Sequence, residues 1–206
     1  MAQNNITAVI LAGGAARRMQ GTPKGFLEIG GKSIVARLES VLTEIFPRTL
    51  LVLKSPDQLC GQPPTLPIVE DQFVDQSAMT GIHAGLFHSA TQRNFICAWD
   101  MPFLQKKVVE ALCAVSPTAD IVVPEWEGRL QPLCAIYQKS CLPIFESAIA
   151  QKNYKIESVF PQLHVHIVPM AEIKKINPNG ISFMNINRPE DLKIAQKLME
   201  EAAPAR

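Results

Sequence analysis

The stretch ITAVILAGGAARRMQGTPKG, residues 6–25, decides the fold class of this 206-residue chain. Its first seven residues, 6–12, are almost all aliphatic or β-branched, and they end at the adjacent glycines Gly13 and Gly14. A short apolar run of this kind predicts a strand buried on both faces, as in a parallel sheet. The glycines predict a loop at the carboxyl end of that strand, which is where open α/β sheets bind their ligands.

The rest of the chain continues this pattern. Apolar runs of strand length recur, and between them apolar residues repeat with the period of a helix. Strands that alternate with helices form βαβ units, so the sequence predicts an α/β fold, a single Rossmann-like three-layer domain with a mostly parallel central sheet and helices on both faces. The predicted strands are residues 6–12, 50–53, 67–69, 95–99, 121–123, 133–137 and 164–168, and the predicted helices are 33–46, 81–90, 105–115, 141–150 and one that begins at 188–191.

The composition is that of an ordinary globular protein. Hydrophobic residues make up 47% and charged residues 19% of the chain, and the formal net charge is only +1. We therefore expect no nucleic-acid partner and no membrane association. The N-terminus has no basic leader, and its apolar part is too short for a membrane span or a signal peptide. Five cysteines without a CxxC pair argue against a disulfide framework or a zinc site, so we expect reduced thiols and a cytoplasmic location.

Cationic side chains follow the glycine loop, namely Arg17, Arg18 and Lys24. Arginine matches phosphate oxygens bidentately, lysine supplies a compact charge, and adjacent glycines let backbone N–H groups approach an anion. These groups together suit a triphosphate. The alternative is a surface turn with solvated cations, but the position at the end of the first strand favours a bound ligand.

Two common phosphate-binding motifs do not fit this segment. A Walker A loop, GxxxxGK[ST], could end at Gly31, Lys32 and Ser33, but its first glycine would then fall on Phe26. The dinucleotide fingerprint GxGxxG fails as well, because alanines and arginines follow Gly14.

A second candidate site follows the predicted strand at 95–99. Asp100 comes at its carboxyl end, where a carboxylate can hold a Mg²⁺ ion that bridges phosphate oxygens. The alternative is that Asp100 only caps a turn, for which Asp-x-Pro is well suited. Glu70 and Asp71 follow the strand at 67–69 on the same rim, where a carboxylate can accept ribose hydroxyls or assist the metal.

Several segments together resemble the molybdenum cofactor guanylyltransferase family, whose members are MobA-like nucleotidyltransferases. The resemblance runs from Ile6 to about Leu198 and rests on LAGGAARRMQG (11–21), PKG (23–25), WDMP (99–102), QPLCAIY (131–137) and FMNINRPEDL (183–192). It implies transfer of GMP from GTP to the terminal phosphate of molybdopterin, with release of pyrophosphate and with Mg²⁺ as cofactor. It also implies one domain over 1–206, with a nucleotide-binding part at about 6–124 and an acceptor-binding part at about 125–200.

The resemblance also assigns roles to individual residues. Arg18, Lys24 and Asp100 would be catalytic, because the two cations would neutralise the triphosphate and Asp100 would be the metal ligand. Asn185 and Asn187 would lie on the pterin side, although a strand-to-helix turn with an Asn cap explains them equally well. The residues implied to bind GTP are Leu11, Ala12, Gly13, Gly14, Lys24, Asp71 and Asp100.

Two departures from the family pattern bear on the site. The sequence SAMTG at 77–81 stands where many members carry GPLAG, and Lys54 stands where an Asn often contacts the nucleotide. Neither removes Lys24 or Asp100, so we expect an active enzyme. The acceptor phosphate is already a nucleophile, so the reaction needs no triad, and we expect the four histidines to be structural or surface residues.

Several other functions fit parts of the sequence. The nearest is a cytidylyltransferase acting on the same cofactor, although that group usually reads LAAG, so Gly13-Gly14 favours guanine because the smaller residue leaves room for a purine. Sugar- or lipid-precursor nucleotidyltransferases share the loop, and a P-loop NTPase is opposed by Phe26. A non-catalytic protein that binds and delivers the cofactor is the alternative from another class. As partners we expect GTP and molybdopterin or molybdenum cofactor, transient contact with molybdoenzymes or other cofactor-biosynthesis proteins, and a monomer or weak oligomer.

Overall fold

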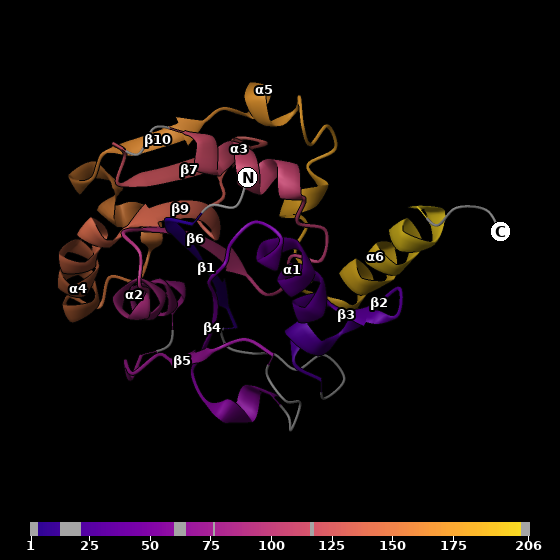
Figure 1. The fold of residues 1–206 in the computed structure, drawn as a ribbon, viewed down its shortest axis with the longest axis horizontal. Helices are drawn as coiled ribbons and strands as arrows, with labels where there is room; N and C mark the ends of the chain where they lie inside the picture. Colours follow the sequence, from indigo (N-terminus) through magenta and orange to yellow (C-terminus); the bar gives the residue numbers. More distant parts are fainter. Residues whose placement is uncertain (1–3, 13–21, 60–64, 76, 116–117, 203–206) are drawn as a thin grey trace.

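A computed structural model describes residues 4–12, 22–59, 65–75, 77–115 and 118–202 of the chain. Within these residues an eight-stranded sheet runs in the order β10-β7-β9-β6-β1-β4-β5, with β8 paired to β7 (Figure 1). Neighbouring strands are parallel except where β8 and β9 take part. The strands are β1 (Ile6–Leu11), β4 (Thr49–Leu53), β5 (Ile68–Glu70), β6 (Arg93–Ala98), β7 (Ile121–Trp126), β8 (Arg129–Leu130), β9 (Cys134–Gln138) and β10 (Val165–Val168).

The central strand β1 places its side chains alternately on the two faces of the sheet. Ile6, Ala8 and Ile10 belong to one buried hydrophobic cluster, and Val9 and Leu11 belong to the other. This is the period of two that an extended chain imposes. Because both faces of β1 are buried, its residues are apolar, as the sequence predicted, except for Thr7, whose hydroxyl accepts a hydrogen bond from Thr91 at 2.9 Å.

Helices cover both faces of this sheet. α1 (Ile34–Thr43) and α3 (Lys106–Ala114) contribute their apolar residues to the first cluster. α2 (Ala78–His88) and α4 (Leu142–Ala150) contribute theirs to the second cluster and contact each other. The three layers confirm the predicted α/β fold with a mostly parallel central sheet (Figure 1).

The first two helices begin at side-chain caps. The Ser33 hydroxyl accepts a hydrogen bond from the Ala36 N–H at 3.3 Å, as the sequence predicted for the start of α1. Ser77 and Thr80 form a reciprocal capping box, each side chain accepting the N–H of the other residue at 3.1 Å. The helix predicted at 81–90 is therefore confirmed as α2, but this capping box starts it earlier, at Ala78.

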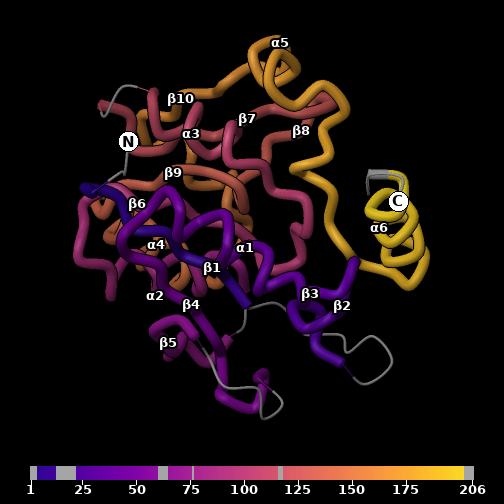
Figure 2. Tube along the Cα trace, turned by 45° about the vertical axis from the view of Figure 1, so that its right-hand side comes forward, coloured from indigo at the N-terminus to yellow at the C-terminus, as the bar shows by residue number. Residues whose placement is uncertain are grey.

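A small hairpin and the last helix lie beside the main sheet. β2 (Glu28–Ile29) and β3 (Lys32–Ser33) are joined through Gly30 and Gly31, whose φ angles of +57° and +73° favour glycine. α6 (Pro189–Ala202) packs against this hairpin, as both views of the chain show (Figure 2). The remaining short helices are η1 (Lys24–Phe26), η2 (Pro56–Leu59), η3 (Lys139–Cys141), η4 (Ile156–Gln162), α5 (Met170–Ile173) and η5 (Ile181–Phe183).

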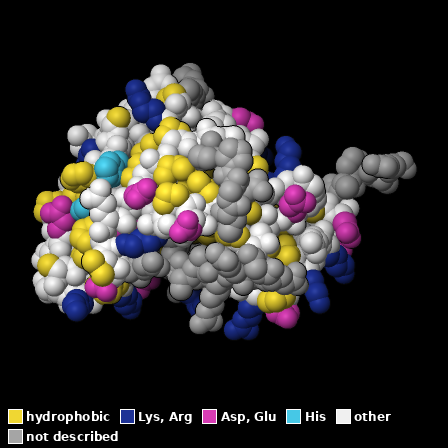
Figure 3. All heavy atoms as spheres, turned by 90° about the horizontal axis from the view of Figure 1, so that it is seen from below, with side chains coloured by type: hydrophobic (Ala, Val, Ile, Leu, Met, Phe, Trp, Pro, Cys, Tyr) yellow, Lys and Arg dark blue, Asp and Glu magenta, His cyan; other side chains and the backbone are white. Residues whose placement is uncertain are grey.

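The surface of the described residues carries charges of both signs. On the face seen in Figure 3, Lys and Arg side chains lie scattered among Asp and Glu. No helix formed by the described residues is long and apolar enough to cross a bilayer.

The described cysteines are buried. Cys97, Cys113, Cys134 and Cys141 are free thiols, and burial raises the pKa of Cys134 to about 12. Cys134 therefore stays protonated and unreactive at neutral pH.

Two glycines of α2 offer a matched test of how closely this helix packs on β1. A Cβ added at Gly85 would lie 2.6 Å from Cγ1 of buried Val9, whereas one at Gly81 would lie 3.6 Å from Leu11. In a helix, Gly→Ala gains about 1 kcal/mol, but overpacking a core costs roughly 1–3 kcal/mol. We expect Gly85→Ala to lower the free energy of unfolding by about 1 kcal/mol and Gly81→Ala to leave it unchanged or raise it, as measured by urea denaturation. Equal stability of the two variants would contradict the close approach at Gly85.

Candidate active site

The carboxyl ends of β1, β4, β5 and β6 meet along one edge of the sheet, here called the carboxyl edge. Backbone pairing continues one residue past these strands, because the Trp99 N–H donates to the Leu11 carbonyl at 3.1 Å and the Asp71 N–H donates to the Leu53 carbonyl at 2.7 Å. The residues beyond the strand ends are thereby held in a row. Those at the carboxyl edge are Leu11, Ala12, Lys54, Asp71, Trp99 and Asp100.

Lys24 is brought to this edge by the short helix η1. A Cβ on its neighbour Gly25 would lie only 2.3 Å from the Trp99 indole, so the backbone of η1 is packed directly on that ring. Phe26 contacts the same indole edge-to-face, with 6.1 Å between ring centroids. These contacts seat η1 on the end of β6, which places Lys24 beside Asp100.

The Lys24 ammonium joins two residues that are distant from it in the sequence. Its Nζ donates to Oδ1 of Asn187 at 2.6 Å and lies 3.7 Å from Oδ2 of Asp100. The side chains of Lys24 and Asp100 are only 14% and 17% exposed. Three residues that the sequence singled out therefore lie together, with Lys24 and Asp100 largely desolvated and Asn187 exposed beside them.

The charge of Asp100 is incompletely balanced at this position. Burial raises the pKa of the Asp100 carboxyl above its ordinary value of 3.8, and the Lys24 ammonium opposes that shift without cancelling it. A carboxylate that is desolvated more than it is compensated gains from a further cation. Asp100 is therefore suited to bind a metal ion.

The chain between η5 and α6 forms the other side of the site. Ile186 is fully buried, and its N–H donates to the Asp100 carbonyl at 2.9 Å. Its neighbours Asn185 and Asn187 are both exposed, which is the alternation expected of an extended segment. Ile186 thus anchors the segment, while the two amides remain available at the surface.

Asp191 fixes Asn187 in turn. Its Oδ2 accepts hydrogen bonds from the N–H groups of Asn187 and Arg188, both at 2.8 Å. An acidic side chain in the first turn of a helix also interacts favourably with the helix dipole, and Asp191 lies in the first turn of α6. Asp191 is therefore a positioning residue that acts on Lys24 through Asn187. The sequence indicated only its place at the start of the helix.

Asp71 and Lys54 lie farther along the carboxyl edge. Asp71 is 7% exposed, and its Oδ1 accepts the Phe73 N–H at 3.0 Å, so its own turn orients the carboxylate. The Lys54 ammonium donates to the Asp71 carbonyl at 3.2 Å. Lys54, which departs from the family pattern, thus adds a cation to the rim between β4 and β5.

Gln58 is a structural link that the sequence did not reveal. Its Nε2 donates to the Ala12 carbonyl at 2.8 Å, and its Oε1 accepts the Lys54 N–H at 2.5 Å. It therefore ties the chain after β4 to the end of β1. Nothing in the composition of the segment SPDQLCGQPP, residues 55–64, distinguishes Gln58 from a solvated turn residue.

The structure brings some of the predicted site residues together and separates others. Lys24, Asp100 and Asn187 are in contact, and Leu11, Ala12 and Asp71 lie along the same edge. Asn185 instead lines a neighbouring cleft. The predicted residues Gly13, Gly14 and Arg18 lie outside the described part of the chain.

Comparison with known proteins places this site in a family. A model described as the MobA-like NTP transferase domain matches residues 8–167. The chain belongs to the MobA-like NTP transferase family.

Two relatives within this family are similar over nearly their whole length. The molybdenum cofactor guanylyltransferase of Desulfosudis oleivorans is 31% identical over 93% of this chain and 94% of its own. A probable molybdenum cofactor guanylyltransferase of Methanosarcina mazei is 34% identical over 91% and 88%.

Solved structures agree with the fold. The molybdopterin-guanine dinucleotide biosynthesis protein A of Archaeoglobus fulgidus superposes with a TM-score of 0.82 at 28% identity, covering 95% of this chain and 99% of that one. The 2-C-methyl-D-erythritol 4-phosphate cytidylyltransferase of Thermus thermophilus has a TM-score of 0.67 at 16% identity, covering 93% and 98%, which shows the shared fold alone. Membership in a nucleotidyltransferase family supports an enzyme.

The raised pKa of Asp100 predicts that its ionised form destabilises the fold of this MobA-like protein. Because the pKa is raised in the folded state, the folded chain holds the proton more tightly, and the free energy of unfolding falls as pH rises from 3.8 through the raised pKa. In metal-free buffer we expect Asp100→Asn to melt above the wild type at neutral pH, with the advantage shrinking as pH approaches 3.8. Calorimetry over that range measures the difference. A lower melting temperature for the variant at neutral pH would mean that the attraction of Lys24 outweighs desolvation.

Proposed function

We propose that this chain transfers GMP from GTP to the terminal phosphate of molybdopterin, forming the guanine dinucleotide cofactor and releasing pyrophosphate. The observation that carries the proposal is the contact of Lys24 with Asp100 and Asn187 at the carboxyl edge. It unites a cation for the triphosphate, a carboxylate for a metal and an amide on the acceptor side. The names of the relatives support the choice of substrates.

The reaction requires alignment of two anions more than it requires acid–base chemistry. A phosphate oxygen of the acceptor attacks the α-phosphorus of GTP, a new P–O bond forms, and the bond to the β-phosphate oxygen breaks so that pyrophosphate leaves. The nucleophile is already charged, so no proton has to be removed. Lys24 would lower the repulsion between the two anions and stabilise the charge that develops on the leaving pyrophosphate.

The residues around Asp100 fit a Mg²⁺ ion. The described residues form no cluster of three His, Cys, Asp or Glu side chains able to hold a metal. Mg²⁺ is nevertheless often held by one or two carboxylates together with substrate phosphates. Asp100 would hold the ion with the phosphate oxygens of GTP, and the ion would spread the negative charge of the triphosphate.

Fewer observations support guanine as the base than support nucleotidyl transfer as the reaction. The fold is shared with a cytidylyltransferase, so the architecture alone does not select the base. Guanine is supported by the predicted role of Gly13 and Gly14 and by the names of the relatives. Cytidylyl transfer to the same cofactor is the second candidate.

We also propose that the reaction takes place in the cytoplasm, as expected from the sequence.

The first test measures pyrophosphate release with molybdopterin and Mg²⁺, with GTP, CTP and ATP as separate substrates. We expect release with GTP alone. Release with CTP in place of GTP would support nucleotidyl transfer but contradict the proposed specificity for guanine. If no nucleotide supports release while a known guanylyltransferase is active with the same acceptor, the proposed transfer is wrong and a binding or delivery role takes its place.

Substitutions at the two charged residues test their roles separately. We expect Asp100→Ala to abolish pyrophosphate release. Lys24→Ala should lower kcat by on the order of 10²–10³-fold, because it removes one preorganised charge from the reacting phosphates. Lys32→Ala, at an exposed lysine of β3, is the matched control and should behave as the wild type. Full activity of Asp100→Ala with Mg²⁺ would show that Asp100 is not the metal ligand. An unchanged kcat of Lys24→Ala would show that Lys24 is only a surface cation.

A further inference from the structure

A polar cleft of about 660 Å³ lies beside the candidate active site. One wall is the hairpin of β7 and β8, and the other is the chain from 179 to 185 that leads into the Lys24 site. The carboxyl end of β7 opens at the same edge of the sheet as that of β6, because both strands run antiparallel to β9, which lies between them. The residues relevant to its chemistry are Trp126, Glu127, Arg129, Gln131, Asn179 and Asn185.

Trp126 gives this cleft a rigid apolar wall. A Cβ on Gly180 would lie 2.1 Å from the indole, so the backbone there is packed against the ring, and Gly180 has a φ of +66° that favours glycine. Phe183 contacts the indole with 5.9 Å between centroids, and the Lys174 ammonium lies 5.9 Å from the ring centroid. These contacts come from residues that are distant from Trp126 in the sequence, and they hold its indole in one orientation.

Arg129 lies directly opposite Trp126 across the hairpin. The two residues are register partners in the antiparallel pair β7–β8, so their side chains project from the same face. Arg129 is exposed, and among the described residues no carboxylate forms an ion pair with it. The turn that links them is closed by Glu127 and Gly128 at φ +50° and +71°. The hairpin therefore presents a cation and an acid at fixed places on the cleft.

The polar groups of the cleft suit one kind of heterocycle. A 2-amino-4-oxopyrimidine ring, as found in a pterin, donates two N–H groups along one edge and presents a carbonyl and ring nitrogens on others. A carboxylate can accept the paired donors, a guanidinium can donate to the carbonyl, and carboxamides can do either. Glu127, Arg129 and the amides of Gln131, Asn179 and Asn185 supply all three groups.

We propose that this cleft binds the pterin ring system of the acceptor, with Arg129 and Glu127 as the residues that recognise the pyrimidine edge. The inference rests on the proposed function for the identity of the acceptor. Asn185 lines the cleft, and Asn187, two residues farther along the chain, holds Lys24. A ligand bound there can therefore extend its terminal phosphate along residues 185–187 toward the carboxyl edge.

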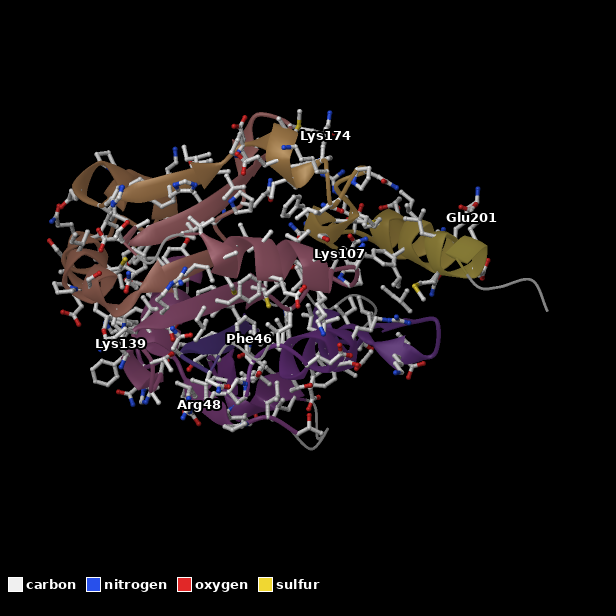
Figure 4. All side chains as sticks on the ribbon, turned by 45° about the horizontal axis from the view of Figure 1, so that its top comes forward. Phe46, Arg48, Lys107, Lys139, Lys174 and Glu201 are labelled. Atoms are coloured by element: carbon white, nitrogen blue, oxygen red, sulfur yellow. The ribbon has the colours of Figure 1, made fainter. Side chains whose placement is uncertain are left out.

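The test measures retention of molybdopterin by ultrafiltration without nucleotide, and in parallel the KM values for molybdopterin and GTP. Loss of a charge-assisted hydrogen bond should weaken molybdopterin binding roughly tenfold or more in Arg129→Ala and in Glu127→Gln. The molybdopterin KM should rise by the same factor while the GTP KM stays unchanged. Arg48→Ala is the matched control, because Arg48 precedes β4 at the opposite edge of the sheet and lies well away from Lys174, whose ammonium lies over the Trp126 ring of the cleft (Figure 4).

The outcomes separate this inference from the proposed function. Wild-type retention of molybdopterin by the cleft variants overturns the inference, even if the enzyme turns over normally. Weakened retention by both variants but not by Arg48→Ala supports it. If that pattern holds but no nucleotide yields pyrophosphate, the cleft assignment stands and the proposed transfer falls. A change in the GTP KM equal to that for molybdopterin would also overturn the inference, because guanine carries the same 2-amino-4-oxopyrimidine edge as a pterin, so the change would indicate either guanine in the cleft or a general loss of structure.

Discussion

The site depends on one electrostatic constraint, which is the partial burial of Asp100 beside a single cation. Burial raises the pKa of its carboxyl, and the Lys24 ammonium at 3.7 Å compensates only in part. Beyond its contact with Lys24, the position of the carboxylate is set by the surrounding fold. The backbone of β6 carries it to the edge, and the Ile186 N–H holds its carbonyl. The incomplete compensation is also what makes the position attractive for a divalent ion.

Two distant segments converge on Asp100 to maintain that constraint, and each does so through ordinary packing or hydrogen bonding. Gly25 allows η1 to pack on Trp99, and in the chain leading into α6 Ile186 is buried in the core while Asp191 accepts the Asn187 N–H. None of these interactions is specific to a nucleotide. Together they place Lys24 and Asn187 against the carboxylate, so the fold itself forms this arrangement; if the proposed reaction takes place here, that would lower the cost of organising the site during the reaction.

The sequence predicted the parts of the structure that depend on local patterns. The alternation of strands and helices gave the fold, Ser33 marked the start of α1, and the ends of β1 and β6 marked the site. The start of α2 was missed because its cap pairs Ser77 with Thr80 instead of the more familiar Glu or Gln. The reversal of β9 and the link through Gln58 were also missed. Both depend on contacts between segments far apart in the chain, about which local periodicity carries no information.

The chain from Asn185 to Asn187 lies between the two proposed substrate sites. Its middle residue is fixed to the sheet by burial and by a hydrogen bond to Asp100, so the backbone on either side of it is held near the sheet. One amide belongs to the cleft and the other to the Lys24 site. If the acceptor and the triphosphate each bind as proposed, their separation is set by this rigid segment and not by a hinge between domains. Alignment of the attacking phosphate would then follow from binding itself, which is the contribution that a reaction between two anions needs most.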